Sequence, residues 1–323
     1  MKKIAVLTSG GDAPGMNAAI RAVVRVAVAA NVEILGVRRG YQGLIDGQIE
    51  PLTARSVSGI IHHGGTMLRT ARCPVFMTSE GRARAARQLE QAGVEGLVVI
   101  GGDGSYRGAH ALHAEHGVPC IGVPGTIDND IGGTDYTIGF DTAMNIAVEA
   151  IDRLRDTAAS HDRIFFVEVM GRHSGFIAMY SGLAGGAEEI LVPEKPSEID
   201  ALIEELRLDR DRGKTSMIVV IAEGDNMGGA SAIAQKVADI SEFKETRVAI
   251  IGHMQRGGTP TAFDRVLAAR MGARAVEALL AGESCAMVAA EGTKITLRAI
   301  SDAWEFRNTF DPDLYRLVRA LSV

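Results

Sequence analysis

Two acidic segments, the first of them rich in glycine, carry residue types that suit phosphoryl transfer. In the first, an apolar run ends in Gly101, Gly102, Asp103, Gly104 and Ser105. Glycines let the backbone approach a polyphosphate closely, because no Cβ stands in the way. The carboxylate of Asp103 suits a Mg²⁺ ion that bridges phosphate oxygens. A strand-to-helix turn capped by Asp103 or Ser105 is the ordinary alternative, and the three glycines favour phosphate or metal contact over it.

The second acidic segment follows soon after and consists of Thr126, Ile127, Asp128, Asn129 and Asp130. Side chains two apart share a face on an extended chain, so Asp128 and Asp130 can point to the same side. A solvated acidic turn is the ordinary alternative, but the segment follows an apolar run at a predicted strand end. One carboxylate for a metal and one for a proton are the least that a kinase requires. The two segments together predict transfer of a phosphoryl group.

Further glycines and basic residues lie just after other apolar runs. Gly10, Gly11 and Gly15 surround Asp12 between a predicted strand and a predicted helix. They fit neither the G-x-x-x-x-G-K-[ST] nor the G-x-G-x-x-G pattern, yet three glycines at a helix start favour phosphate contact. Arginine also suits phosphate, because its planar guanidinium donates two hydrogen bonds to one anion. Basic residues in such positions are Arg172, His253 and Arg256.

The apolar pattern predicts the elements that position these residues. Short Val- and Ile-rich runs alternate with longer Ala-rich stretches of helical character. This alternation implies mainly parallel sheets with helices on both faces, whose ligand sites follow the strand ends. The predicted strands are residues 4–8, 33–37, 96–100, 120–123, 164–170, 217–222 and 247–251, and the predicted helices include 17–30, 82–92, 142–157 and 264–281.

Length and composition narrow the class of protein. A chain of 323 residues predicts two domains, and 46% hydrophobic residues supply ample core. The net charge of −6 argues against a nucleic-acid surface. No apolar run approaches the roughly 18 residues that a membrane helix needs. The scattered Cys73, Cys120 and Cys285 suit free thiols in a reducing compartment. We therefore expect a cytoplasmic protein with neither nucleic-acid nor membrane partners.

These motifs together resemble those of the bacterial ATP-dependent 6-phosphofructokinases, from residue 4 to about residue 281. The matching segments are residues 7–19, 101–105, 124–130 and 247–258, with Asp264 and Arg265 beyond them. The resemblance implies an α/β fold of two Rossmann-like, three-layer domains with mainly parallel sheets. It implies a larger ATP-binding domain at residues 1–138 with 255–303, and a smaller sugar-phosphate and effector domain at 139–254 with 304–323.

The resemblance also implies the reaction, which is the committed step of glycolysis. The γ-phosphoryl group of ATP would pass to the 1-hydroxyl of fructose 6-phosphate, with Mg²⁺ as cofactor. Asp128 would be the general base, Asp103 would hold the metal, and Arg72, Thr126 and Arg172 would complete the catalytic set. The implied ATP contacts are Gly11, Arg72, Cys73, Gly102, Asp103, Gly104 and Ser105. The implied fructose 6-phosphate contacts are Thr126, Ile127, Asp128, Asp130, Arg163, Met170, Gly171, Arg172, Glu223, Arg247, His253 and Arg256.

In the family, the residues at Arg163 and Arg247 reach the site of a neighbouring subunit, which implies a homotetramer with shared active sites. Gly104 and Gly125 bear on the phosphoryl donor, because pyrophosphate-dependent relatives carry aspartate and lysine there. A carboxylate at position 104 would crowd and repel the α-phosphate of ATP, so glycine predicts ATP. Pyrophosphate as donor and a catalytically silent sensor are the alternatives, and the sensor would have no use for Asp128.

Regulation is implied by a second anion site of the family, which binds ADP or phosphoenolpyruvate at a subunit interface. The corresponding residues are Arg21, Arg25, Arg55, Arg155, Gly186, Glu188, Arg212 and Lys214. From spacing alone, Arg21 and Arg25 are better explained as a solvated helix face. Ala54, Thr215 and Ser216 depart from the more basic pattern of the family. We therefore expect a working catalyst with a blunted effector response.

Overall fold

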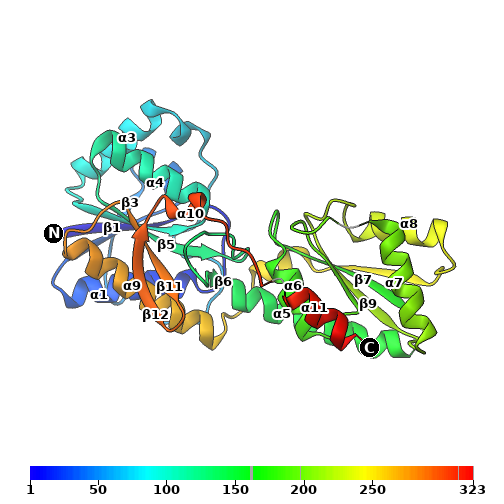
Figure 1. Ribbon diagram of the computed structural model, residues 1–323. Helices are drawn as coiled ribbons and strands as arrows, with labels where there is room; N and C mark the ends of the chain where they lie inside the picture. The colour runs from blue at the N-terminus through cyan, green and yellow to red at the C-terminus, as the bar shows by residue number, and fades with distance from the viewer. Residues whose placement is uncertain (161–162, 197, 312, 323) are drawn as a thin grey trace. The chain divides into compact units, whose positions relative to one another are not determined.

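The computed structural model describes residues 1–160, 163–196, 198–311 and 313–322 (Figure 1). The chain divides into two compact units. The first comprises Met1–Asp141 with Arg256–Asn308, and the second comprises Thr142–Gln255 with Thr309–Val323. Each unit has its own sheet and is described by itself.

A mainly parallel sheet forms the centre of the first unit. Its strands are β1 (Lys3–Thr8), β2 (Glu33–Val37), β3 (Ile49–Leu52), β4 (Gly96–Gly101), β5 (Cys120–Thr126), β6 (Ile138–Gly139), β11 (Ala286–Glu291) and β12 (Lys294–Ala299). The strand order is β12–β11–β5–β4–β1–β2–β3, with β6 paired to β5. β12 and β3 run antiparallel to their neighbours, and the other pairs are parallel. The carboxyl ends of β1, β4 and β5 therefore lie along one edge.

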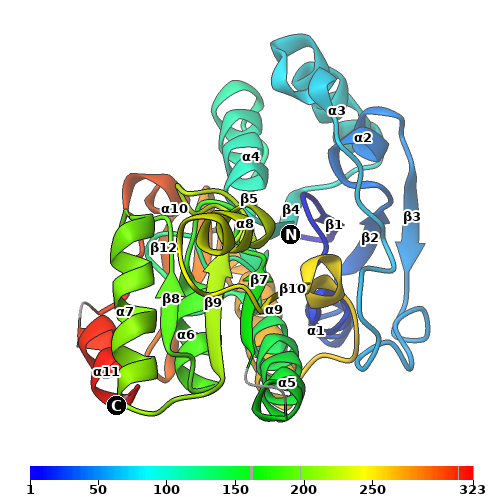
Figure 2. The ribbon, with the colours of Figure 1, turned by 90° about the vertical axis from the view of Figure 1, so that its right-hand side faces the viewer.

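Helices cover both faces of this sheet (Figures 1 and 2). The helices of one face are α1 (Met16–Ala29) and α9 (Ala262–Leu280), and those of the other are α2 (Gly40–Ile45), α3 (Ser79–Gln91) and α4 (Asp103–His116). Strand side chains alternate between the faces, so Leu7 of β1 and Val99 of β4 join the core with α2, α3 and α4. The short elements η1 (Pro74–Met77) and α10 (Asp302–Glu305) complete the unit.

The second unit has a fully parallel sheet. Its strands are β7 (Ile164–Val169), β8 (Glu189–Leu191), β9 (Met217–Ala222) and β10 (Thr246–Ile250), in the order β10–β7–β9–β8. Its helices are α5 (Phe140–Ala159), which starts in the first unit, α6 (Phe176–Ala184), α7 (Ile199–Asp211), α8 (Ala230–Ile240) and α11 (Asp313–Leu321). Val219 and Ile221 of β9 pack with α7 and α8, whereas Val220 faces Gly182 of α6. Helices thus cover both faces here too.

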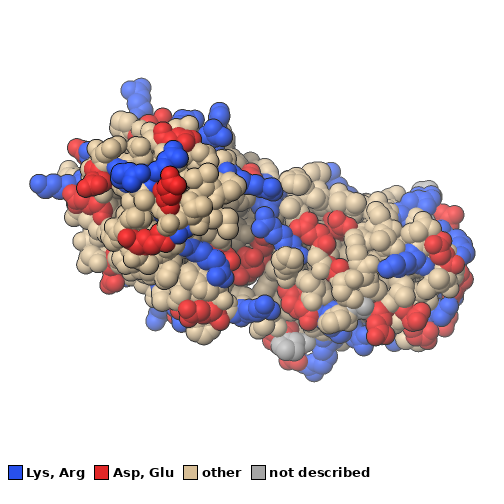
Figure 3. All heavy atoms as spheres, turned by 90° about the horizontal axis from the view of Figure 1, so that it is seen from above, with Lys and Arg blue, Asp and Glu red and all other residues tan. Residues whose placement is uncertain are grey.

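The predicted α/β class with mainly parallel sheets is confirmed, and every predicted strand overlaps an observed one. The hairpin of β11 and β12 was not predicted. Residues 286–291 are rich in alanine, which favours helices, and only burial and pairing with β12 and β5 make them a strand. No helix in the described ranges is both long and apolar enough to span a bilayer. Acidic and basic side chains are intermingled on the face shown in Figure 3.

Candidate functional site

The two acidic segments lie on neighbouring loops of the first unit. β4 and β5 are parallel neighbours, and their register pairs the last residue of β4 with Pro124. A Cβ added to Gly102 would lie 3.9 Å from the Cβ of Thr126. Asp103 is the first residue of α4, and Asp128 lies two residues beyond the end of β5. The structure therefore brings both segments to one edge of the sheet.

Asp103 has the properties of a ligand for a metal that arrives with phosphates. Its side chain is 41% exposed, and its two carboxylate oxygens accept hydrogen bonds from Nε of Arg107 at 3.0 and 3.2 Å. Among the described residues, no group of three or more His, Cys, Asp or Glu side chains is placed to hold a metal alone. Mg²⁺ is commonly bound by one or two carboxylates together with substrate phosphates. The accessible Asp103 carboxylate fits that manner of binding.

Asp128, in contrast, lies on a buried and well-fixed loop. Asp128 is only 4% exposed, and its backbone N–H donates to Thr126 Oγ1 at 3.2 Å. Asn129 has a φ of 51° and its Oδ1 accepts the N–H of Thr137 at 2.9 Å. The Thr137 hydroxyl in turn donates to the Thr126 carbonyl at 2.7 Å. Ile127 is fully buried and Asp130 is exposed. Thr137, which was not predicted, thus helps to hold this loop.

The glycine loop after β1 is in contact with a predicted sugar-phosphate residue. Nη1 of Arg256 donates to the Asp12 carbonyl at 3.0 Å. A Cβ added to Gly11 would lie 2.7 Å from that same nitrogen, so the guanidinium occupies the space beside the glycine. Arg256 was predicted to contact fructose 6-phosphate, and Gly11 to contact ATP. The structure places these two residues side by side within the first unit.

Asn17 fixes the segment that leads to Arg72 and Cys73. It is buried on α1, and its Nδ2 donates to the carbonyls of His63 and Gly64, both at 3.1 Å. Its Oδ1 accepts the N–H of Met67 at 2.7 Å. Arg72 is exposed and Cys73 is half-buried a few residues later. Asn17 stood in the quoted motif, but nothing local in the sequence shows these partners.

We expect Asn17→Ala to lower both stability and catalytic efficiency. One N–H and two carbonyls lose their partner, which costs about 1–3 kcal/mol of unfolding free energy. A displaced Arg72 lowers kcat/KM for the phosphoryl donor on the order of tenfold. Urea unfolding and initial rates measure the two effects. Asn17→Asp keeps the acceptor for Met67 but places a carboxylate oxygen against the carbonyls of His63 and Gly64, so it should be destabilised at least as much as Asn17→Ala. An Asn17→Ala enzyme with normal kcat/KM contradicts this role.

In the second unit, three predicted sugar-phosphate residues form one hydrogen-bonded group. The Glu223 carboxylate accepts the backbone N–H groups of Gly171 at 3.3 Å and Arg172 at 2.8 Å. Arg172 adopts a left-handed conformation with a φ of 54°. The N–H of Met170 donates to Oε1 of the buried Gln255 at 2.8 Å. Gln255 was not predicted, although it stands between His253 and Arg256 in a quoted motif.

The two arginines expected to reach a neighbouring subunit lie at the start of strands. Arg163 precedes β7 and is half-buried, whereas Arg247 is exposed on the edge strand β10. Arg247 Nη2 lies 3.2 Å from a Glu245 carboxylate oxygen. His253 is exposed in η2 (Gly252–Arg256). Arg247 and His253 are thus exposed to solvent within the single chain, whereas Arg163 is half-buried.

Several predicted effector residues form an ion-pair network in the second unit. Oε1 of the buried Glu188 lies 3.5 Å from Arg155 Nη1 and 3.4 Å from Lys214 Nζ. Asp209 pairs with Arg212 at 3.3 Å and with Lys214 at 3.7 Å. Two carboxylates thus pair with the three cations of this network, which leaves it with one net positive charge. The remaining predicted effector residues are Gly186 in the second unit and Arg21, Arg25 and Arg55 in the first.

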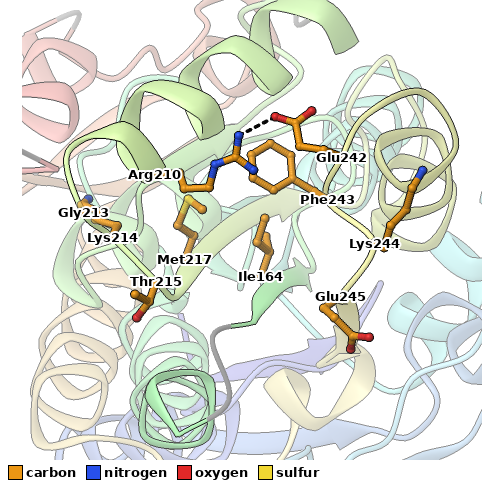
Figure 4. A pocket seen from close by; sticks show the side chains of 10 residues that line it. All are labelled: Ile164, Arg210, Gly213, Lys214, Thr215, Met217, Glu242, Phe243, Lys244 and Glu245. Atoms are coloured by element: carbon orange, nitrogen blue, oxygen red, sulfur yellow. Dashed lines mark hydrogen bonds and ion pairs between the residues drawn. The ribbon is translucent and has the colours of Figure 1, made fainter.

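A cavity of about 440 Å³ opens where β7 and β9 begin in the second unit (Figure 4). The Arg210 guanidinium lies 4.8 Å from the centre of the Phe243 ring and pairs with Glu242 at 2.7 Å. Hydrogen bonds from Arg207 above all lower the pKa of Glu242 to about 2, so this carboxyl is ionised at neutral pH. Lys214 lines this cavity and also belongs to the ion-pair network with Glu188 and Asp209. The acidic loops after β4 and β5 contribute nothing to it.

Comparisons with known proteins agree with these features. The family described as Phosphofructokinase matches residues 3–279. ATP-dependent 6-phosphofructokinase 1 of Thermus thermophilus is 57% identical over 323 residues, which is 100% of both chains. ATP-dependent 6-phosphofructokinase of Bacillus pumilus is 54% identical over 323 residues, again 100% of both. The phosphofructokinase structure from Saccharomyces cerevisiae aligns with a TM-score of 0.90 and 34% identity, and covers 99% of this chain and 50% of the yeast chain. This chain thus spans about half of the yeast chain's length. It belongs to the phosphofructokinase family.

Proposed function

We propose that this chain is an ATP-dependent 6-phosphofructokinase, which phosphorylates the 1-hydroxyl of fructose 6-phosphate in glycolysis. The observation that carries the proposal is that Asp103 and Asp128 each lie two residues after the end of one of two adjacent parallel strands. The Asp103 carboxylate is accessible, as a metal ligand must be, and the backbone of Asp128 is held by Thr126, which fixes the position of the proposed base. The names of the relatives from Thermus thermophilus and Bacillus pumilus support ATP as the donor.

In the proposed mechanism Asp128 accepts the proton of the 1-hydroxyl while the hydroxyl oxygen attacks the γ-phosphorus. The bond from that phosphorus to the oxygen bridging the β-phosphate breaks, and ADP leaves. Arg72 and Arg172 offset the charge on the transferred group, as fixed cations do. Thr126 keeps the loop in place through its hydrogen bond from the Asp128 N–H. Mg²⁺, with Asp103 as its protein ligand, would supply electrostatic stabilisation of the phosphates when bound.

The proposed ATP contacts lie in the first unit, and they are Gly11, Arg72, Cys73, Gly102, Asp103, Gly104 and Ser105. A Cβ added to Gly104 meets no atom within 4 Å, so this position has open space beside it. A Cβ added to Gly125 would lie 3.0 Å from the Ile100 side chain and 3.2 Å from that of Met16. A lysine at position 125 would therefore be crowded. The open space beside Gly104 leaves room for a nucleotide, and the crowding at Gly125 disfavours the lysine of pyrophosphate-dependent relatives.

Besides Arg163 and Arg247, ten residues are proposed to contact fructose 6-phosphate. Those that belong to the first unit are Thr126, Ile127, Asp128, Asp130 and Arg256, and those that belong to the second are Met170, Gly171, Arg172, Glu223 and His253. Arg163 and Arg247 would come from a neighbouring subunit, so the active form would be an oligomer, and we propose the homotetramer that the family resemblance implies. We also propose that it acts in the cytoplasm. We assign ATP binding to residues 1–138 with 255–303. Sugar-phosphate and effector binding is assigned to residues 139–254 with 304–323.

Initial rates with each phosphoryl donor test the proposed function. The purified chain is given Mg²⁺ and fructose 6-phosphate with either ATP or pyrophosphate, and fructose 1,6-bisphosphate is detected by a coupled assay. We expect turnover with ATP. Faster turnover with pyrophosphate would refute the donor assignment. No turnover with either donor at high protein concentration would favour a sensor, and the phosphoryl-transfer proposal would be wrong.

We expect Arg247→Ser to weaken fructose 6-phosphate binding more than it lowers kcat. A charge-assisted hydrogen bond contributes about 1.5–3 kcal/mol, so KM for the sugar phosphate should rise by about 10- to 100-fold. Arg153→Ser, which removes another exposed arginine paired with a glutamate, is the matched control. Because the arginine would serve a neighbouring subunit, mixing Arg247→Ser with Asp128→Asn subunits should restore some activity. Unchanged sugar-phosphate affinity contradicts the shared site.

We also propose a weak effector response. The cations Arg155, Arg212 and Lys214 are paired with Glu188 and Asp209, so an incoming anion must compete with these carboxylates. Initial rates against fructose 6-phosphate are measured with and without ADP or phosphoenolpyruvate. The half-saturating concentration should shift little with either compound. A strong shift would contradict the blunted response and show that the substituted residues at positions 54, 215 and 216 are dispensable.

A further inference from the structure

A guanidinium lies between the proposed metal ligand and an aromatic ring in the first unit. Arg107 is one turn after Asp103 on α4, and its Nε donates to both oxygens of that carboxylate at 3.0 and 3.2 Å. The guanidinium carbon Cζ of Arg107 lies 4.7 Å from the centre of the Trp304 ring of α10. The His110 ring meets Trp304 edge-on, with 5.6 Å between the ring centres. Asp103, Arg107 and Trp304 thus form one contiguous group.

In this group the Arg107 guanidinium and a bound Mg²⁺ ion would compete for the Asp103 carboxylate. A Mg²⁺ ion that takes an Asp103 oxygen as ligand withdraws the electron pair to which Arg107 now donates, and it repels the guanidinium. We propose that Arg107 is the counter-ion that the metal–nucleotide complex displaces from Asp103, and that Trp304 retains the released guanidinium by cation–π contact. The inference rests on the proposed function, because it requires Asp103 to be the metal ligand. Arg107 is therefore a positioning residue, which acts through Asp103.

The exposure of the pair makes this exchange feasible. The side chains of Arg107 and Asp103 are 54% and 41% exposed. Exposed ion pairs four residues apart on a helix are weak, whereas a divalent cation bridging a carboxylate and phosphates is held more strongly. Indole is the aromatic ring that binds cations best, so the guanidinium keeps a partner after it leaves Asp103. Opening the pair lowers the affinity for the metal–nucleotide complex only modestly.

Trp304 makes the exchange measurable. It is the single tryptophan of the 323-residue chain, so indole emission reports on this ring alone. A cation that moves relative to an indole changes its emission. We expect MgATP to change the emission of the wild-type protein, whereas ATP in the presence of EDTA leaves it unchanged because Arg107 stays on Asp103. In Arg107→Gln the ring lacks the guanidinium from the outset, and most of the MgATP response should be lost.

Equilibrium binding supplies the second readout. The dissociation constant of MgATP is measured by calorimetry on the full chain for wild type, Arg107→Gln and Arg107→Lys. Removing the competitor should tighten binding by up to about fivefold, the equivalent of an exposed ion pair of about 1 kcal/mol. Arg107→Lys restores the cation and should bind MgATP like wild type, with only part of the emission response. Arg153→Gln removes one positive charge from a similar exposed pair with Glu149 and should change neither readout.

Three results would overturn the inference. The first is Arg107→Gln binding MgATP as wild type does. The second is weaker binding by that variant, which would mean that the guanidinium attracts the phosphates. The third is a wild-type emission that ATP changes equally with and without free metal. A wild-type enzyme that binds and turns over MgATP while any of these holds refutes only this inference. A wild-type protein without turnover refutes the proposed function instead.

Discussion

Asp128→Asn lowers kcat for fructose 6-phosphate phosphorylation by about 10²–10⁴-fold, the range expected for loss of a general base. The amide has the shape of the carboxylate but cannot take the proton of the 1-hydroxyl. The backbone hydrogen bond from residue 128 to the Thr126 hydroxyl does not involve the replaced group, so this bond is kept. Dissociation constants for ATP and the sugar phosphate should remain within a few-fold of wild type. Steady-state rates and calorimetry measure these quantities.

The neighbouring Asp130 is the internal comparison for this experiment. It lies in the same loop but is exposed, and it is proposed to contact the sugar rather than to accept its proton. Asp130→Asn should therefore raise KM for fructose 6-phosphate while most of kcat is retained. If Asp128→Asn instead showed a raised KM with kcat preserved, the base would have to be another group.

The second large effect is expected at Gly104. Gly104→Asp should lower kcat/KM for ATP by about 10²-fold or more, because a juxtaposed like charge costs several kcal/mol. No protein atom lies within 4 Å of a Cβ added there, and a carboxylate in the first turn of α4 suits the helix dipole. The melting temperature should accordingly stay the same. The loss would then come from the nucleotide and its α-phosphate rather than from the fold.

Gly104→Asn separates the size of the side chain from its charge. It has the same shape as the aspartate variant, so any difference in kcat/KM between the two is electrostatic, and that difference should shrink as salt is added. The rate with pyrophosphate, which has no α-phosphate attached to a nucleoside, should be less affected by the aspartate. An aspartate variant that uses ATP normally would show that the α-phosphate lies elsewhere.

Sequence reasoning succeeds here where the signal is local. The glycines and aspartates after β4 and β5 directly follow apolar runs, and the rule that parallel strands present their carboxyl ends together then places them at one edge. Arg107 also has a readable local signal, because it stands four residues after Asp103, a spacing that brings the two side chains together once a helix begins there.

Contacts between distant parts of the chain could not be predicted in the same way. Arg256 reaches the Asp12 carbonyl across 244 positions of sequence, and Asn17 reaches Met67 across 50. No pattern in either segment specifies the other, because such pairs exist only after the sheet and its helices have packed. The β11–β12 hairpin is a similar case, in which pairing and burial override the helix preference of alanine.

Glu188 joins the ion-pair network of the second unit to the backbone of its sheet. Its Oε2 accepts the N–H of Ile218 at 2.6 Å, and its own N–H donates to the Ile218 carbonyl at 2.9 Å. The carboxylate therefore ties the start of β8 to β9 as well as meeting Arg155 and Lys214. Loss of this carboxylate would remove the hydrogen bond to β9 as well as the ion pairs, so Glu188 should persist in descendants of this gene whether or not they respond to an effector.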